Sequence, residues 1–122
     1  MFAMRCLGCC LVWGLVVMSA PGAFGQAAKA VPDCGALLKQ MSDTHAKLAA
    51  DMPDEQKEVA KYCAWGRATY LPTLKQLISV WESNPSLTCA GQPSTYFSNN
   101  EKRGLERAQK SVDAACLKAG TP

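Results

Sequence analysis

Apolar residues recur at helical spacing in three stretches of the chain. The first stripe advances in alternating steps of four and three residues, through Cys34, Leu38, Met41, His45, Leu48 and Met52. This spacing places the side chains on one face of an α-helix. Asp33 stands just before the stripe, where its carboxylate can accept a hydrogen bond from a free backbone N–H. We therefore predict a first helix over about residues 34–50, with Asp33 as its N-cap.

A second stripe keeps the same period through Val59, Cys63, Gly66, Tyr70, Leu74, Leu77 and Trp81. Pro53 suits the first position of a helix, and acidic residues follow it in the first turn. We expect this helix to begin at Pro53 after a very short linker, which makes an antiparallel hairpin with the first helix. Pro72 leaves two alternatives: one helix kinked near residues 68–72, or two short helices meeting there. The unbroken phase of the stripe favours the kink.

The third stripe follows a segment rich in turn formers, residues 85–98, which we interpret as a long loop. Ser98 and Glu101 match the S-x-x-E capping box, so the last helix is expected to begin there. Its inner positions are Leu105, Ala108, Val112, Cys116 and Ala119, with Gly120 as the stop. No alternating strand pattern competes. The sequence predicts an all-α antiparallel bundle of three helices, or of four if the chain breaks at Pro72.

The first 25 residues have the three parts of a secretory signal. Arg5 precedes an apolar run over residues 7–18, and small residues follow up to Gly25. A membrane-spanning helix needs about 20 apolar residues, so this run is too short for a stable span. We predict a cleavable signal peptide over residues 1–25 and one mature domain over residues 26–122, although cuts after Ala28 or Ala30 also fit. The protein is then periplasmic or secreted.

Four cysteines remain in the mature chain, and their even number in an exported protein predicts two disulfides. They are Cys34, Cys63, Cys89 and Cys116. Their wide spacing offers no zinc or thioredoxin-type motif. If the helices run antiparallel, Cys63 and Cys116 come level with each other, which leaves Cys34 for Cys89. The other two pairings stay open, because a break at Pro72 would change the levels.

Charge and residue types argue against nucleic acid binding and catalysis. The mature chain has twelve Lys and Arg against ten Asp and Glu, an excess too small to indicate a nucleic acid partner. A nucleophilic mechanism needs an activated side chain beside a base, and His45 is the one histidine. No enzyme, cofactor or metal is therefore expected. For His45 three interpretations stay open: a hydrogen-bonded histidine at a helix seam, a soft metal ligand beside Met41 or Met52, or a pH switch.

Two features are candidates for interaction. Arg103, Arg107 and Lys110 form a basic stripe on the last helix, although Glu106 can pair with Lys110 and such stripes are often only a solvated face. Tyr96 and Phe97 fall in the predicted loop. Exposed aromatic side chains on an anchored loop are typical of binding sites.

In size, export and helical content the chain is similar to small disulfide-stapled helical proteins of the bacterial periplasm, a class that includes acid-stress chaperones and immunity proteins. This likeness rests on no shared motif and does not establish function. The leading hypothesis is a non-catalytic exported protein that binds another exported protein. The alternatives are a small-ligand or metal-binding module, with a pocket near Met41, His45 and Tyr70, and an acid-stress periplasmic chaperone.

Overall fold

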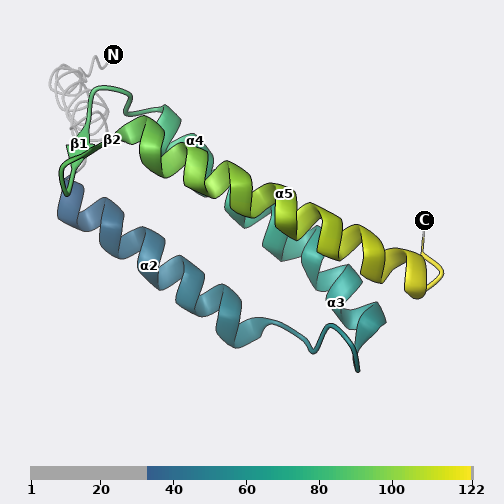
Figure 1. Ribbon diagram of the computed structural model, residues 1–122. Helices are drawn as coiled ribbons and strands as arrows, with labels where there is room; N and C mark the ends of the chain where they lie inside the picture. The colour runs from purple at the N-terminus through teal and green to yellow at the C-terminus, as the bar shows by residue number, and fades with distance from the viewer. Residues whose placement is uncertain (1–32, 122) are drawn as a thin grey trace, which may run out of the picture. The chain divides into compact units, whose positions relative to one another are not determined.

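The computed structural model describes residues 33–121, which form three antiparallel helical rods and a small β-hairpin (Figure 1). The first rod is α2 (Cys34–Asp51). The second combines α3 (Val59–Trp65), the π-helical turn η1 (Gly66–Tyr70) and α4 (Leu71–Glu82), and the third is α5 (Ser94–Lys118). The hairpin pairs β1 (Thr88–Cys89) with β2 (Gln92–Pro93). The predicted helical bundle with two disulfides is confirmed, and the hairpin adds to it.

The predicted signal peptide, residues 1–25, lies outside the described residues. Export therefore stays a prediction. Within residues 33–121, no helix combines the length and the apolar character that crossing a bilayer requires.

Helix α2 begins where the sequence predicts. The Asp33 carboxylate accepts a hydrogen bond from the Ala36 N–H at 3.3 Å, which satisfies one of the free donors of the first turn. Leu37 and Leu48, three turns apart, are the buried residues of this helix. Much of its remaining surface faces solvent, so α2 is a single-faced amphipathic helix.

The second rod begins later than Pro53, so the prediction of a very short linker was wrong. Asp54 folds the linker into a turn, because its Oδ1 accepts hydrogen bonds from the N–H groups of Gln56 and Lys57, each at 2.9 Å. An aspartate that bonds its own downstream backbone competes with helix formation. The residues expected to open the helix therefore close a turn, and α3 begins at Val59.

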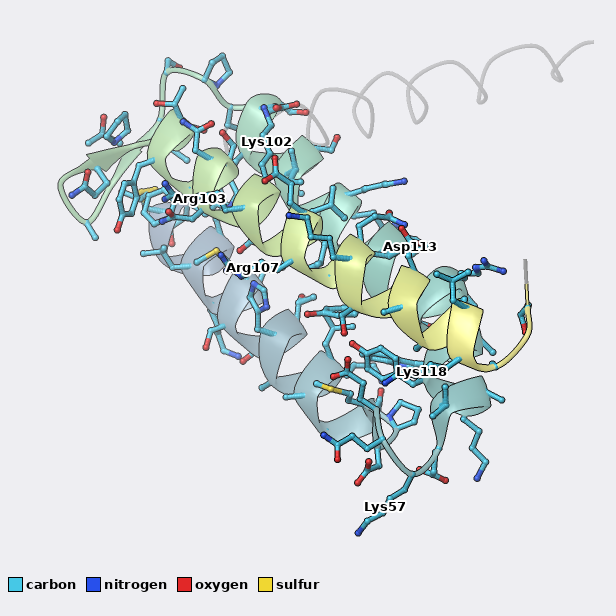
Figure 2. The ribbon with its side chains drawn as sticks, turned by 45° about the vertical axis from the view of Figure 1, so that its right-hand side comes forward. Lys57, Lys102, Arg103, Arg107, Asp113 and Lys118 are labelled. Atoms are coloured by element: carbon cyan, nitrogen blue, oxygen red, sulfur yellow. A yellow bond between two sulfur atoms is a disulfide. The ribbon has the colours of Figure 1, made fainter. Side chains whose placement is uncertain are left out.

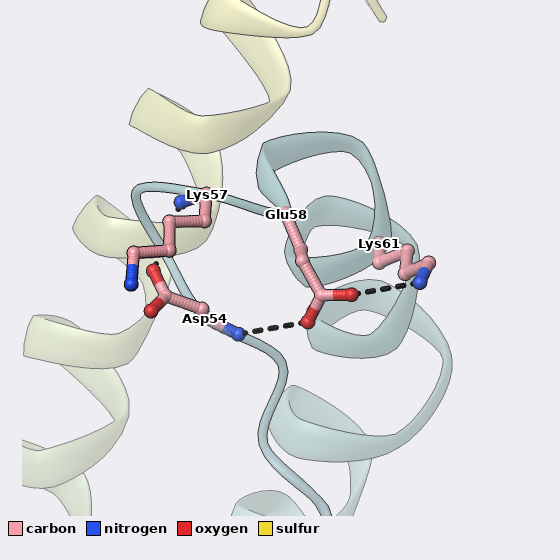
Figure 3. A network of polar contacts seen from close by, with 4 residues as sticks. All are labelled: Asp54, Lys57, Glu58 and Lys61. Atoms are coloured by element: carbon pink, nitrogen blue, oxygen red, sulfur yellow. Dashed lines mark hydrogen bonds and ion pairs between the residues drawn. The ribbon is translucent and has the colours of Figure 1, made fainter.

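Glu58 ties this turn to α3. Its Oε1 lies 2.7 Å from Lys61 Nζ, and its Oε2 accepts a 3.4 Å hydrogen bond from the Asp54 N–H (Figure 3). The hydrogen bond from Lys61, followed by that from the Asp54 backbone, lowers the pKa of Glu58 below its ordinary value. The bond to Glu58 likewise raises the pKa of Lys61.

This geometry predicts a pH-dependent contribution of Glu58 to stability. A folded-state pKa below the unfolded one favours folding above the unfolded pKa, and the benefit is lost as pH falls through the folded pKa. Urea unfolding should therefore find Glu58→Gln less stable than wild type at pH 7, with the two curves converging in acid. In a Lys61→Gln background the pH-dependent difference should shrink. An equal difference at every pH would contradict this account.

Pro72 does not break the second rod. The Leu71 N–H bonds to the Gly66 carbonyl, five residues back, and the flanking residues keep right-handed helical dihedral angles. A helical proline normally clashes with the carbonyl four residues before it. The wider π-helical turn directly upstream accommodates the ring, as such turns do where helices are distorted. The first alternative, one helical rod that passes through Pro72, is confirmed over residues 59–82, and its distortion is the π-helical turn η1.

The predicted loop over residues 85–98 is shorter than expected, and it contains strands. Ala90 and Gly91 connect the two strands with φ angles of 50° and 74°. Two consecutive positive φ values are typical of the tight turns that close β-hairpins. Cys89, on β1, is buried and held by its disulfide.

Helix α5 begins at Ser94, five residues after Cys89, so the capping box at Ser98 was wrong. The Ser98 hydroxyl donates to the Thr95 carbonyl at 3.2 Å, as in a helix interior, and Glu101 bonds elsewhere. Ser94 is buried, and its hydroxyl donates to the Trp81 carbonyl near the end of α4. This contact docks the start of α5 on α4. The end of α5 agrees with the sequence, since Gly120 takes a φ of 71° just past the helix.

Two apolar clusters and two disulfides hold the rods together. The larger cluster joins α3, η1, α4 and α5 with Leu48 of α2. The smaller cluster lies at the hairpin end and contains Leu37, Trp81, Cys89 and Phe97. The disulfides are Cys34–Cys89 and Cys63–Cys116, which confirms the favoured pairing.

A candidate interaction face on α5

The early start of α5 brings four of the five candidate interaction residues onto one face of this helix. Tyr96 now lies on the same helix as Arg103, Arg107 and Lys110, at offsets of seven, eleven and fourteen residues. These offsets are close to whole numbers of helical turns, so the four side chains share one face. All four are exposed.

We call this face the α5 row. It advances from its first residue in steps of four, three, four, three, four and three, through Tyr96, Asn100, Arg103, Arg107, Lys110, Ala114 and Leu117. Figure 2 shows Arg103 and Arg107 in succession along α5, with Lys118 beyond them. Asn100, Ala114 and Leu117 were not predicted, because a helix starting at Ser98 gave no reason to count from Tyr96.

The cations of the row have no ion-pair partner among the described residues. Within residues 33–121, Arg107 and Lys110 form no ion pair, and Arg103 donates only to the Asn100 side chain. The possible pair of Glu106 with Lys110 is not formed. Elsewhere the described lysines are often paired: Lys39 with Asp43, Lys47 with Asp51 at 3.1 Å, Lys61 with Glu58 and Lys102 with Glu82. The α5 row therefore presents uncompensated positive charge.

The two aromatic candidates separate. The Phe97 side chain is buried and stacks on Trp81, with ring centroids 4.4 Å apart. Phe97 is thus a core residue, and the exposed loop position expected for it was wrong. The Tyr96 ring is nearly perpendicular to that of Phe97, with ring centroids 5.3 Å apart, and the Tyr96 residue stays 45% exposed. An aromatic side chain anchored on one side and open on the other is suited to contact a partner.

His45 lies at the seam between α2 and α5, as the first of its three interpretations expects. Its Nε2 lies 2.8 Å from Oε1 of Glu101, and the imidazole is 46% exposed whereas the carboxylate side chain is 8% exposed. A buried carboxylate needs such a partner to offset its loss of hydration. His45 therefore provides the hydrogen-bond partner that the buried Glu101 carboxylate needs. Among the described residues, no group of three or more His, Cys, Asp or Glu residues could hold a metal.

The residues expected to line one pocket, Met41, His45 and Tyr70, have different surroundings. Met41 packs against the smaller apolar cluster, and Tyr70 packs against the larger one. Tyr70 stacks on Trp65 with ring centroids 4.8 Å apart, and Trp65 meets Tyr62 at 5.8 Å. Burial, followed by Tyr62, raises the pKa of Tyr70, while the nearby Arg107 guanidinium opposes the shift. Both Trp65 and Tyr70 are partly buried against the larger apolar cluster.

A short polar chain borders these rings. The Ser111 hydroxyl donates to Glu55 Oε1 at 2.6 Å, so the Tyr62 hydroxyl donates to Ser111 Oγ at 3.0 Å. Nearby, the Trp65 Nε1 is buried without a hydrogen-bond partner among the described residues. Sequence spacing gives no signal for the polar chain, because its partners lie about fifty residues apart.

A shallow open depression lies on the flank of α5 and includes Leu105, Glu106, Gln109 and Lys110. Its edge adjoins the α5 row at Lys110. The depression has too few converging polar groups to indicate a specific small ligand.

Comparison with protein-family models, with curated protein sequences and with solved structures found no match to this chain.

Proposed function

We propose that this protein is exported and acts without catalysis, by binding another exported protein through the α5 row. The observation that carries the proposal is the uncompensated charge of Arg103, Arg107 and Lys110 on one exposed face. Complementary charge on a partner would be steered toward this face and oriented by it.

The remaining features support a binding role. Tyr96 adds an exposed aromatic side chain at one end of the row, and aromatic and arginine residues contribute strongly to protein interfaces. The disulfides are compatible with an oxidising compartment, where the signal sequence would send the chain. The Cys63–Cys116 disulfide also fixes α5 to α3, so the row is presented on a rigid element.

The ligand-binding alternative has less support. The imidazole that it would use is already bonded to Glu101, and the Tyr70 ring is stacked on Trp65. A binding site in this region would have to break these contacts.

Charge reversal tests the proposal. The mature chain, residues 26–122, is immobilised and exposed to the exported proteins of its source. We expect wild type to capture a stoichiometric partner, and the triple variant Arg103→Glu, Arg107→Glu, Lys110→Glu to lose it by at least about a hundredfold in affinity, since like charges at a contact cost several kcal/mol. Because the three side chains are exposed, the variant should keep the wild-type melting temperature.

The matched control reverses three exposed cations outside α5, namely Lys57, Arg67 and Lys75. It changes the net charge by the same amount and should retain the partner. If wild type captures no stoichiometric partner, or if both triple variants behave alike, the α5 row is not the binding face.

A further inference from the structure

The α5 row is long, narrow and mixed in character. Its first and last residues are 21 positions apart, roughly 32 Å along a helix. The basic residues occupy its middle, and the two ends are apolar, with Tyr96 45% and Leu117 79% exposed. Exposed apolar residues that flank a charged centre are suited to a partner of the same length.

The positive part of the row is one side chain wide. Glu106 and Asp113 are exposed on one flank, about a quarter turn from the row, so a broad anionic surface would also meet these carboxylates. Peripheral membrane helices carry a wide apolar face, which this helix lacks on its solvent side. The row is therefore better matched to a linear partner than to a flat one.

An α-helix is the linear element whose side chains recur on one face at steps of three and four residues. When two helices cross at about 20°, residues at alternating steps of three and four from each helix meet along the contact. A second copy of α5 would place arginine against arginine, so the charges exclude self-pairing along this row. A different helix with carboxylates at its centre would pair with all three cations.

We propose that the occupant of the α5 row is an acidic amphipathic helix of another protein, with carboxylates at steps of four and three in its middle and apolar side chains at both ends. This inference rests on the proposed function and names the partner's contacting element. Ala114, small and exposed, gives such a helix room to approach near one end.

Designed peptides test the inference. The probe is an alanine-based helix of about 24 residues, roughly 36 Å long, with leucines near its ends and three glutamates at steps of four and three. A second peptide has the same composition, with its glutamates on three different faces. A third keeps the matched spacing but contains central prolines, which prevent a helix.

We expect the matched peptide to bind the mature chain at low salt at least about tenfold more tightly than either other peptide, to gain helicity on binding, and to be released as salt screens the charges. The Arg103→Glu, Arg107→Glu, Lys110→Glu variant should lose this peptide and instead bind its lysine counterpart. The control variant at Lys57, Arg67 and Lys75 should bind the matched peptide like wild type.

Three results would overturn the inference: equal binding of the three peptides, binding of the proline peptide alone, or no peptide binding while phosphatidylglycerol vesicles capture the chain. The capture experiment with exported proteins separates this failure from that of the proposed function. If a partner is captured through the α5 row and the peptides fail, the binding role stands and the helical partner is wrong. If wild type captures no partner, the proposed function is wrong.

Discussion

Removal of the Cys63–Cys116 disulfide, by Cys63→Ala with Cys116→Ala, should lower the free energy of unfolding by roughly 3–5 kcal/mol. The bond closes a loop with a sequence separation of 53 residues, and the chain-entropy model assigns about 4 kcal/mol to a loop of that size. Both cysteines are also buried in the larger apolar cluster, so the substitution loses packing as well. Because a domain is stabilised by only about 5–15 kcal/mol in total, much of the molecule's stability depends on this bond.

The matched comparison is Cys34→Ala with Cys89→Ala, whose bond has a sequence separation of 55 residues. The loop entropy is nearly the same, but Cys34 is only partly buried, so this variant should be the more stable of the two. Urea unfolding of all three proteins under oxidising conditions measures the difference. A Cys63–Cys116 double variant within about 1 kcal/mol of wild type would contradict this account of the core.

Gly66→Ala should destabilise the protein by about 1–3 kcal/mol, although alanine in a helix is normally preferred to glycine by about 1 kcal/mol. A Cβ added at Gly66 would overlap Cγ2 of Val112 and lie 2.9 Å from its Cγ1. Val112 is completely buried, and its β-branched side chain has one strongly preferred rotamer in a helix. Neither residue can move away, so the second rod and α5 must separate.

Two further variants identify the cause. In a Val112→Ala background the clash is relieved, so Gly66→Ala should cost at least about 1 kcal/mol less than it does in wild type. Gly104→Ala places a Cβ in open space on α5 and should raise stability by up to about 1 kcal/mol. If Gly66→Ala melts at or above the wild-type temperature, the close approach of the two helices is not a constraint on this fold.

The candidate site was only partly predictable. The basic residues were visible as a stripe because helical spacing alone places Arg103, Arg107 and Lys110 together. The roles of Tyr96 and Phe97 were not visible. Both depend on where α5 begins, and the capping box at Ser98 is a local signal that loses to the burial of Phe97 against Trp81. Three-dimensional packing therefore decided which aromatic residue faces solvent.

The ends of the helices were harder to predict from the sequence than their buried faces, for the same reason. Asp54 can cap a helix or close a turn, and the two outcomes differ by a few hydrogen bonds of about 1 kcal/mol each. Pro72 can break a helix or be accommodated by a π-helical turn, and its neighbours' packing selects the second. Asp33 and Gly120, by contrast, act through their own backbone and side-chain geometry, and both were predicted correctly.

The sequence by itself determined the three helical stripes and the all-α class. The level of each cysteine along antiparallel helices favoured the observed disulfide pairing and left the other two pairings open. These features depend on period and length, which every turn of a helix repeats, so a single ambiguous residue does not change them. Only the tertiary structure decided the start of α3 and α5, the bond between His45 and Glu101, and the close approach of Gly66 to Val112. The start of α3 depends on the local turn at Asp54, whereas the other three depend on contacts between residues well separated in the chain. Neither kind of contact leaves a periodic signal in the sequence.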